Sequence, residues 1–124
     1  MRTLGGLENA GHKRSIVAGT TIFAVGAAPD CMYSIIEGQV DLLVNGKLVE
    51  TVSPGGIFGE MALIDNDNRT ATAVAKTDLK VVSIDQSEFL RLVQQTPSFA
   101  LHVMRALTDR LRRMDERVLR VSRP

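Results

Sequence analysis

The chain has 124 residues, of which 44% are hydrophobic and 23% are charged, and its formal net charge is +1. This length and composition predict one globular domain that buries a core without disulfides or metals, and the small net charge argues against general attraction to nucleic acid or acidic membranes. Cys31 is the single cysteine, which fits a reducing cytoplasm and excludes a cysteine-ligated iron–sulfur cluster. No run reaches the length of a membrane helix and the N-terminus lacks a secretory apolar core, so we expect a cytoplasmic protein with no membrane partner.

The first 14 residues are polar and glycine-containing, with only Leu4 and Leu7 to anchor them. We expect residues 1–14 to form a loose arm. From residue 15 to residue 84 the sequence predicts short β-branched and apolar strands separated by turns. The expected strands cover residues 21–23, 32–36, 40–44, 48–52, 71–75 and 79–84. Asn45-Gly46 is the strongest hairpin signal, and strands at this spacing predict a sandwich or barrel.

The stretch from residue 55 to residue 72 interrupts the strands with a different chemistry. Two glycines after Pro54 permit a close backbone approach, and residues 58–63 have room for little more than one helical turn. The first amides of such a turn have no partner inside the helix and suit an anion. Arg69 follows an acidic, asparagine-rich loop, and its guanidinium fork suits paired phosphate oxygens, whereas Glu60 can only accept and suits a sugar hydroxyl. The stretch therefore predicts a site for a small phosphorylated ligand that carries a ribose.

Two helices are expected in residues 85–121. Asp85 and Glu88 predict a capping box at the start of the first helix, which should end near Pro97. The second helix should run from about Ser98 to about Val121. Its apolar residues alternate four and three apart, as in a heptad seam, at Ala100, Met104, Leu107, Leu111, Met114, Val118 and Val121. We expect the first part of this stripe, up to Leu107, to pack on the chain's own strands and the part from Leu111 onward to meet a partner helix.

One resemblance becomes specific at these residues. Phe58-Gly59-Glu60-Met61-Ala62-Leu63, followed at this separation by Arg69-Thr70-Ala71-Thr72, resembles the phosphate-binding cassette of cyclic nucleotide-binding domains. That family includes catabolite activator protein, the regulatory subunits of cAMP-dependent protein kinase and cyclic-nucleotide-gated channels. The similarity extends from about Ala18 to Arg113. It implies a mainly β fold with flanking helices: a β-roll of the jelly-roll type, a short phosphate-binding helix and C-terminal helices, all in a single domain over residues 1–124.

The resemblance assigns roles within the cassette. Arg69 is expected to hold the exocyclic oxygens of the cyclic phosphate, and Glu60 to accept from the ribose 2′-hydroxyl. Gly59 and the amides near Met61 and Ala62 should face the phosphate. The alternatives are a surface Arg69 paired with Asp65 or Asp67, a Glu60 that only stabilises the dipole of its helix, and a Gly59 needed only for its turn.

The residues that contact the base are less closely determined. Thr70 can offer its amide and hydroxyl, and a threonine at this place occurs both in cGMP-dependent kinases and in channels that respond to cAMP, so both nucleotides stay open with cAMP ahead. Phe58 and Val49 are expected either to contact the base or to be ordinary core. Arg110 lies where bacterial channel relatives have an arginine that closes over the base, and the alternative is a solvated basic helix face.

The function expected from these residues is a non-enzymatic sensor of cAMP or cGMP, with no metal or other cofactor. Ligand binding would be coupled to rearrangement of the C-terminal helices, and the last helix would form a homodimer. Nothing after that helix predicts a helix-turn-helix, so we expect no direct DNA binding by this chain; its downstream effector is left open.

Two rival functions remain. One is a dimerisation or interaction module on the same fold that binds no nucleotide. The other is a phosphodiesterase or metal-dependent enzyme, which the two histidines, far apart in the sequence, and the lack of a nucleophile–base pair argue against.

Overall fold

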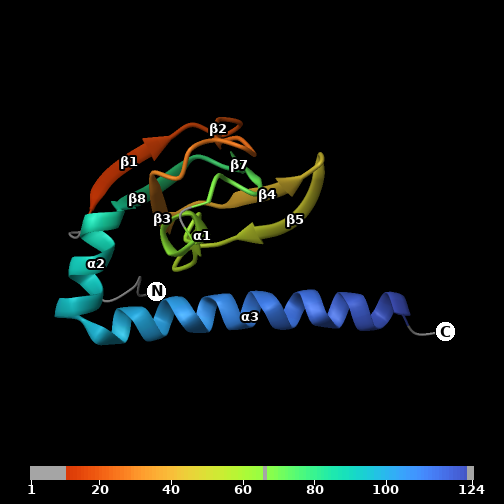
Figure 1. The fold of residues 1–124 in the computed structure, drawn as a ribbon. Helices are drawn as coiled ribbons and strands as arrows, with labels where there is room; N and C mark the ends of the chain where they lie inside the picture. The colour runs from red at the N-terminus through yellow and green to blue at the C-terminus, as the bar shows by residue number, and fades with distance from the viewer. Residues whose placement is uncertain (1–10, 66, 123–124) are drawn as a thin grey trace.

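The computed structural model describes residues 11–65 and 67–122, leaving out the side chains of residue 62 and of residues 114–122. In this part of the chain eight strands precede two long helices, and one short helix interrupts the strands (Figure 1). The strands are β1 (His12–Ile16), β2 (Thr21–Phe23), β3 (Cys31–Glu37), β4 (Val40–Val44), β5 (Lys47–Val52), β6 (Ile57–Phe58), β7 (Thr72–Ala75) and β8 (Leu79–Asp85). The helices are α1 (Met61–Ile64), α2 (Gln86–Gln95) and α3 (Pro97–Ser122).

The strands form two antiparallel four-stranded sheets, in the orders β1-β8-β3-β6 and β2-β7-β4-β5. The sheets curl around one another into a roll, and α3 runs beneath it while α2 stands at one end (Figure 1). The expected mainly β fold with flanking helices is confirmed. Each expected strand is present with ends shifted by at most one residue. Only β1 and the two-residue β6 lie outside the ranges predicted.

The β4–β5 hairpin turns at Asn45-Gly46, as the sequence predicted. Both residues have positive φ, 53° at Asn45 and 74° at Gly46. A two-residue turn of this kind needs the left-handed region at both positions, which asparagine and glycine tolerate best. Local turn chemistry therefore sets the register next to the turn, and the pairing shifts by one residue further along, between Leu42 and Leu43.

Strand β1 corrects the prediction of a loose arm over residues 1–14. It begins at His12 and pairs antiparallel with β8 from His12↔Ser83 to Ile16↔Leu79. Four of its five residues are exposed and only Ile16 is buried. Backbone pairing at the sheet edge therefore stabilises β1 without an alternating apolar pattern, so its sequence carries little strand signal. The rest of the predicted arm, residues 1–10, lies outside the described residues.

Strands β3 and β8 separate two apolar cores. Tyr33 and Ile35 face the inside of the roll, whereas Met32 faces the helices, as the alternation of a strand requires. On β8, Val81 faces inward and Val82 outward in the same way. Both strands are consequently buried on both faces, which explains their nearly continuous apolar sequence.

Helix α2 begins with the predicted capping box. The Asp85 carboxylate accepts from the Glu88 amide at 2.9 Å, and the Glu88 carboxylate accepts from the Asp85 amide at 2.9 Å. The helix ends at Gln95, and Pro97 opens α3, where its fixed φ is suitable and its missing amide hydrogen costs nothing.

The packing face of α3 differs from the predicted seam. Phe99 and Val103 are buried against the roll, with Ala106 and Leu107 partly buried beside them. Met104 is 59% exposed, so the prediction that it packs on the strands is wrong. The Phe99 ring packs edge-on against Phe89 of α2 and fixes the rotation of the helix. Phe99 was not among the residues of the predicted seam. Leu111 is also exposed, and the side chains of Met114, Val118 and Val121 lie outside those described.

Within the described residues, no helix has both the length and the apolar composition needed to span a membrane.

Candidate functional site

The cassette predicted at residues 55–72 is a short strand, a glycine and one turn of helix. Strand β6 pairs with β3 through Ser34↔Ile57 and Tyr33↔Phe58. The chain then turns at Gly59, with a φ of 76°, into α1, whose first carbonyl acceptor is Glu60. Glu60 makes no side-chain cap to this helix. Its carboxylate is therefore available for contacts elsewhere.

Arg69 is held by the loop between β2 and β3. Its amide donates to the Ala27 carbonyl at 2.8 Å, and its carbonyl accepts from the Gly26 amide at 2.7 Å. Gly26 has a φ of 86°, so glycine suits this turn. This backbone ladder fixes the residue from which the guanidinium extends.

The Arg69 guanidinium is buried and strongly bound. Nη1 donates to the Gly59 carbonyl at 3.0 Å, and Nη2 donates to Asp30 Oδ1 at 2.7 Å and to the Cys31 carbonyl at 2.6 Å. The Phe23 ring lies against the guanidinium, with Cζ 4.0 Å from the ring centroid. The side chain is only 2% exposed, and its partner is Asp30 rather than either of the loop aspartates considered from the sequence. A surface arginine is thus excluded.

Asp30 and Cys31 show the charge balance around this arginine. Partial burial raises the pKa of Asp30, but the hydrogen bond and charge of Arg69 outweigh it, so the net pKa is lowered. Burial raises the pKa of the Cys31 thiol, which keeps it protonated and argues against a nucleophilic role. The Arg69 guanidinium is therefore paired with an ionised carboxylate at neutral pH.

Gly59 is required by Arg69 as well as by the turn. A Cβ at this residue would lie 2.6 Å from Arg69 Nη1 and 3.4 Å from the Phe23 ring. A side chain there would displace the guanidinium. Gly59 therefore has two structural roles, because it permits the turn and also leaves room for the Arg69 guanidinium.

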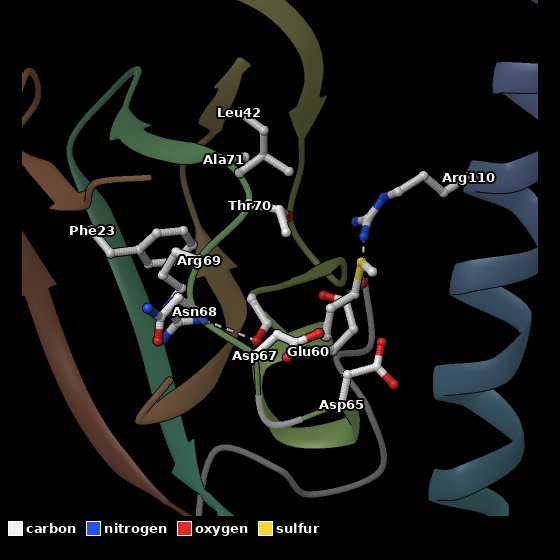
Figure 2. Close-up of a pocket in the computed structure, with 12 residues that line it drawn as sticks. Phe23, Leu42, Glu60, Asp65, Asp67, Asn68, Arg69, Thr70, Ala71 and Arg110 are labelled. Atoms are coloured by element: carbon white, nitrogen blue, oxygen red, sulfur yellow. Dashed lines mark hydrogen bonds and ion pairs between the residues drawn. The ribbon is translucent and has the colours of Figure 1, made fainter. Parts of the chain in front are cut away.

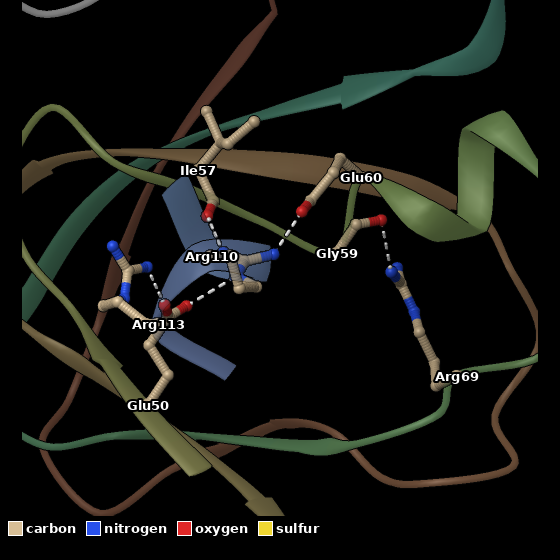
Figure 3. A network of polar contacts seen from close by, with 7 residues as sticks. All are labelled: Glu50, Ile57, Gly59, Glu60, Arg69, Arg110 and Arg113. Atoms are coloured by element: carbon tan, nitrogen blue, oxygen red, sulfur yellow. Dashed lines mark hydrogen bonds and ion pairs between the residues drawn. The ribbon is translucent and has the colours of Figure 1, made fainter. Parts of the chain in front are cut away.

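Glu60 lies across the site from Arg69 and is 1% exposed (Figure 3). One carboxylate oxygen, Oε1, accepts from Arg110 Nη1 of α3. Arg110 also donates from Nε to Glu50 Oε2 at 2.7 Å and from Nη2 to the Ile57 carbonyl at 3.1 Å. Arg113 pairs with the other oxygen of Glu50. Helix α3 is thus joined to β5 and to the cassette by a cluster of two carboxylates and two guanidiniums.

Two buried polar atoms of the site have no partner within the described residues: Glu60 Oε2 and Arg69 Nε. Both belong to residues that line one cavity, of about 90 Å³, shown in Figure 2. Burying a polar atom unpaired is costly, and the cost is recovered when a ligand supplies the hydrogen bond. The unpaired atoms are one acceptor and one donor, as a ligand with a hydroxyl and an anionic oxygen requires.

The cavity gathers most of the predicted residues. Its lining comes from β2, β4, the cassette and α3: Phe23, Leu42, Gly59, Glu60, Met61, Asp65, Asp67, Asn68, Arg69, Thr70, Ala71 and Arg110. Phe58 is fully buried in the inner core, stacked on Tyr33 at 4.9 Å, and does not line this cavity. Val49 is half-buried on β5 and is also absent from the lining. The Ala62 side chain lies outside those described.

Sequence reasoning missed Phe23, Leu42, Asp30 and Glu50. Phe23 and Leu42 lie on strands read simply as core, and their place at the cavity depends on how the two sheets close. Asp30 and Glu50 are charged residues of a loop and a strand, far in sequence from their arginine partners. Among the described residues no group of three or more histidine, cysteine or acidic side chains is placed to hold a metal ion.

The sequence profile of the cyclic nucleotide-binding domain matches residues 13–96, which include the roll, the cassette and α2. The chain belongs to the cyclic nucleotide-binding domain family. In this family the domain is regulatory and generally has no catalytic activity of its own.

Solved structures agree with this membership. Catabolite activator protein of Thermus thermophilus is 28% identical, with a TM-score of 0.80, over 92% of this chain and 56% of that one. A cAMP-bound PfPKA-R is 28% identical with a TM-score of 0.72, over 85% of this chain and 36% of that one. A protein of a cyclic-GMP-dependent signalling pathway in bacterial phytopathogenesis is 30% identical with a TM-score of 0.69, over 97% of this chain and 98% of that one.

The chain spans little more than half the length of the solved Thermus protein and about a third of the solved PfPKA-R chain. It matches the phytopathogenesis protein over nearly the full length of both.

Proposed function

We propose that this domain is a sensor that binds cAMP or cGMP by gripping the ribose with Glu60 and the cyclic phosphate with Arg69. The observation that carries the proposal is that Glu60 and Arg69, which line one cavity, each keep a buried polar atom without a partner among the described residues, Oε2 and Nε. The first can accept from the ribose 2′-hydroxyl, and the second can donate to an exocyclic phosphate oxygen. The amides at the start of α1 would donate to the same phosphate.

The size of the cavity orients the ligand. Pockets that enclose a whole small molecule have volumes of roughly 300–1,000 Å³, so a cavity of about 90 Å³ suits the ribose phosphate end alone. The base would then lie toward the opening, near the exposed side chains of Met61 and Thr70. Phe58 is too deeply buried for the base contact considered from the sequence, and Leu42 would supply the apolar contact instead.

The charge of the lining favours a cyclic phosphate over an open one. Three carboxylates and two guanidiniums line the cavity: Glu60, Asp65, Asp67, Arg69 and Arg110. A cyclic phosphodiester carries a single negative charge, whereas a phosphomonoester carries about −1.5 to −2 at neutral pH. The extra charge would be repelled by the loop carboxylates.

Titration calorimetry with cAMP, cGMP and AMP tests the proposal. We expect heat with one or both cyclic nucleotides, cAMP ahead, and far weaker binding of AMP. No heat with either cyclic nucleotide would favour the rival function, an interaction module that binds no nucleotide. Conversion of cAMP into AMP in the presence of divalent metal would instead favour an enzyme.

The signal would pass through α3, since Arg110 joins that helix to Glu60. A ligand transmits a signal only if it binds one arrangement of the helix better than another.

The exposed apolar side chains of α3, Leu101, Met104 and Leu111, support a homodimer through this helix. Sedimentation with and without nucleotide tests the homodimer, which Leu111→Glu should dissociate. A chain that is monomeric in both conditions, or a dimer that Leu111→Glu does not dissociate, would contradict it. A cytoplasmic location and the absence of direct DNA binding belong to the same proposal.

A further inference from the structure

Strand β2 shifts its register against β7 immediately before Phe23. Thr21 pairs with Val74, whereas Phe23 pairs with Ala73, so β2 has one extra residue at this point, as at a β-bulge. In a regular strand, residues two apart point to the same face, and Phe23 would face outward with the exposed Thr21. Instead, Phe23 lies opposite the fully buried Ala73, and the consecutive residues Ile22 and Phe23 both pack on the inner core. The register shift therefore turns Phe23 into the roll.

Inside the roll, the Phe23 ring belongs to a cluster of three aromatic rings that ends at the Arg69 guanidinium. Tyr33 and Phe58 are stacked, with ring centroids 4.9 Å apart. The Phe23 centroid lies 6.2 Å from that of Tyr33 and 6.1 Å from that of Phe58. The Arg69 guanidinium covers the Phe23 ring, with Cζ 4.0 Å from the centroid (Figure 2). The guanidinium therefore packs directly on the inner core.

The same ring lies against the turn that opens the cassette. A Cβ added at Gly59 would be 3.4 Å from Phe23 Cε2 and 2.6 Å from Arg69 Nη1. The N–H groups of a guanidinium lie in its plane, so the hydrogen bond from Arg69 Nη1 to the Gly59 carbonyl holds only an edge of the group. A ring against its face opposes tilting out of that plane. Phe23 thus fixes Arg69 relative to the turn from which α1 begins.

We propose that Phe23 is a positioning residue for the phosphate end of the ligand site: its ring holds the Arg69 guanidinium against the cassette turn, in the arrangement that binds an anionic oxygen of a cyclic nucleotide. With an aliphatic side chain at residue 23, the guanidinium would lose a cation–π contact and gain room to tilt. Phe23 lines the cavity, but the guanidinium covers its ring, so it acts on the ligand through Arg69. This inference rests on the proposed function and names the residue that orients its phosphate contact.

Calorimetry with the cyclic nucleotide that the unmodified chain binds, cAMP or cGMP, tests this role. A cation–π contact to a buried guanidinium changes the population of the held arrangement by about 3- to 30-fold. Affinity falls in proportion to the fraction of chains in the binding arrangement. Phe23→Leu should therefore weaken binding by about 3- to 30-fold, whereas Phe23→Tyr keeps the ring and should stay within about 2-fold of the unmodified chain.

Ile22→Ala is the matched control. It removes an apolar contact with the same core from the neighbouring residue of β2, and Ile22 does not line the cavity. It should lower stability and leave affinity unchanged. Chemical unfolding of each variant measures the stability and checks that the fold is retained.

Nuclear magnetic resonance of the chain without nucleotide separates positioning from a purely structural role. Protons above the face of an aromatic ring resonate upfield, so the guanidinium signals of Arg69 should carry a ring-current shift. Phe23→Leu should remove this shift, and Phe23→Tyr and Ile22→Ala should keep it. A ring that served only the core would leave the Arg69 signals where they are.

The outcomes distinguish the inference from the function beneath it. Unchanged affinity in Phe23→Leu, an equal loss in Phe23→Tyr or Ile22→Ala, or Arg69 signals that do not move in Phe23→Leu would overturn the role of Phe23 while the sensor function stands. If the unmodified chain binds neither nucleotide, the proposed function fails. The Arg69 signals of the free chain then still decide whether Phe23 holds the guanidinium.

Discussion

Gly59 and Arg69 constrain one another at the centre of the site. Gly59 has a φ of 76°, and a Cβ there would meet Arg69 Nη1 at 2.6 Å. Gly46 has almost the same φ, 74°, and a Cβ added there would meet no atom within 4 Å. The two glycines therefore have the same backbone requirement, and only one of them has a neighbour to displace.

Gly59→Ala should consequently lower nucleotide affinity by about 10-fold or more, because the displaced guanidinium loses a charge-assisted hydrogen bond. Gly46→Ala is the matched control. Both variants should lose about 1–2 kcal/mol of unfolding free energy to the left-handed backbone, and only Gly59→Ala should lose affinity as well. Calorimetry measures the affinity and urea unfolding measures the stability. Unchanged affinity in Gly59→Ala would show that the Arg69 side chain can bind the ligand from a different position.

Asp30 makes the stability of the site depend on pH. Its pKa is lowered in the folded chain by Arg69, which outweighs the effect of burial. A carboxyl with a lowered folded pKa stabilises the fold above its unfolded pKa, and this stabilisation is lost as the pH falls through the folded pKa. The window therefore lies below the ordinary value of 3.8.

Asp30→Asn should be less stable than the unmodified chain at about pH 7, and the difference should shrink at about pH 3. Urea unfolding at the two pH values measures it. A difference of the same size at both would mean that the Asp30 charge does not stabilise the fold.

At the scale of elements, α3 is fixed by Phe99 rather than by the seam that its sequence suggests. Phe99 is 5% exposed and Met104 is 59% exposed. Phe99→Ala should cost about 3–5 kcal/mol of unfolding free energy, since it leaves a cavity against α2 and the roll. At a dilution where the chain is monomeric, Met104→Ala should change it by less than about 0.5 kcal/mol. Denaturant unfolding compares them, and a large loss in Met104→Ala alone would restore the predicted seam.

The elements that the sequence predicted well are those with a local cause. Asn45-Gly46 forces its turn, Asp85 and Glu88 cap their helix, and the apolar runs of β3 and β8 follow from burial on both faces. The cassette was predictable because Gly59, Glu60 and Arg69 lie within one stretch of the sequence, with Gly59 ten residues before Arg69, and each has a distinct chemistry. The roles assigned to them remain predictions about the ligand.

What escaped prediction depends on contacts distant in sequence. Strand β1 is polar and exists because β8 offers it an edge. Asp30 is 39 residues from Arg69, and Glu50 is 60 residues from Arg110, so neither pairing leaves a local pattern. The rotation of α3 was mispredicted because two apolar stripes share the helix, and only packing against the roll chooses between them.

At the scale of the whole molecule, binding of a nucleotide to the folded chain should raise the free energy of unfolding. A ligand that binds only the folded chain, present at about 100 times its dissociation constant, adds about 2.7 kcal/mol to the unfolding free energy. Arg69→Gln should show little of this gain at the same ligand concentration. Thermal unfolding with and without cAMP or cGMP measures both, and an equal gain in the variant would mean that the ligand binds without Arg69.

The account depends most on the unpaired Arg69 Nε–H donating to the phosphate of a cyclic nucleotide. Nuclear magnetic resonance of the arginine Nε–H groups observes this bond directly, with Arg69 assigned by substitution. On saturation with the nucleotide, we predict a marked downfield shift of the Arg69 Nε proton, as expected when a new hydrogen bond to an anion forms. An Arg69 signal unchanged by nucleotide that calorimetry shows to be bound would contradict the central claim.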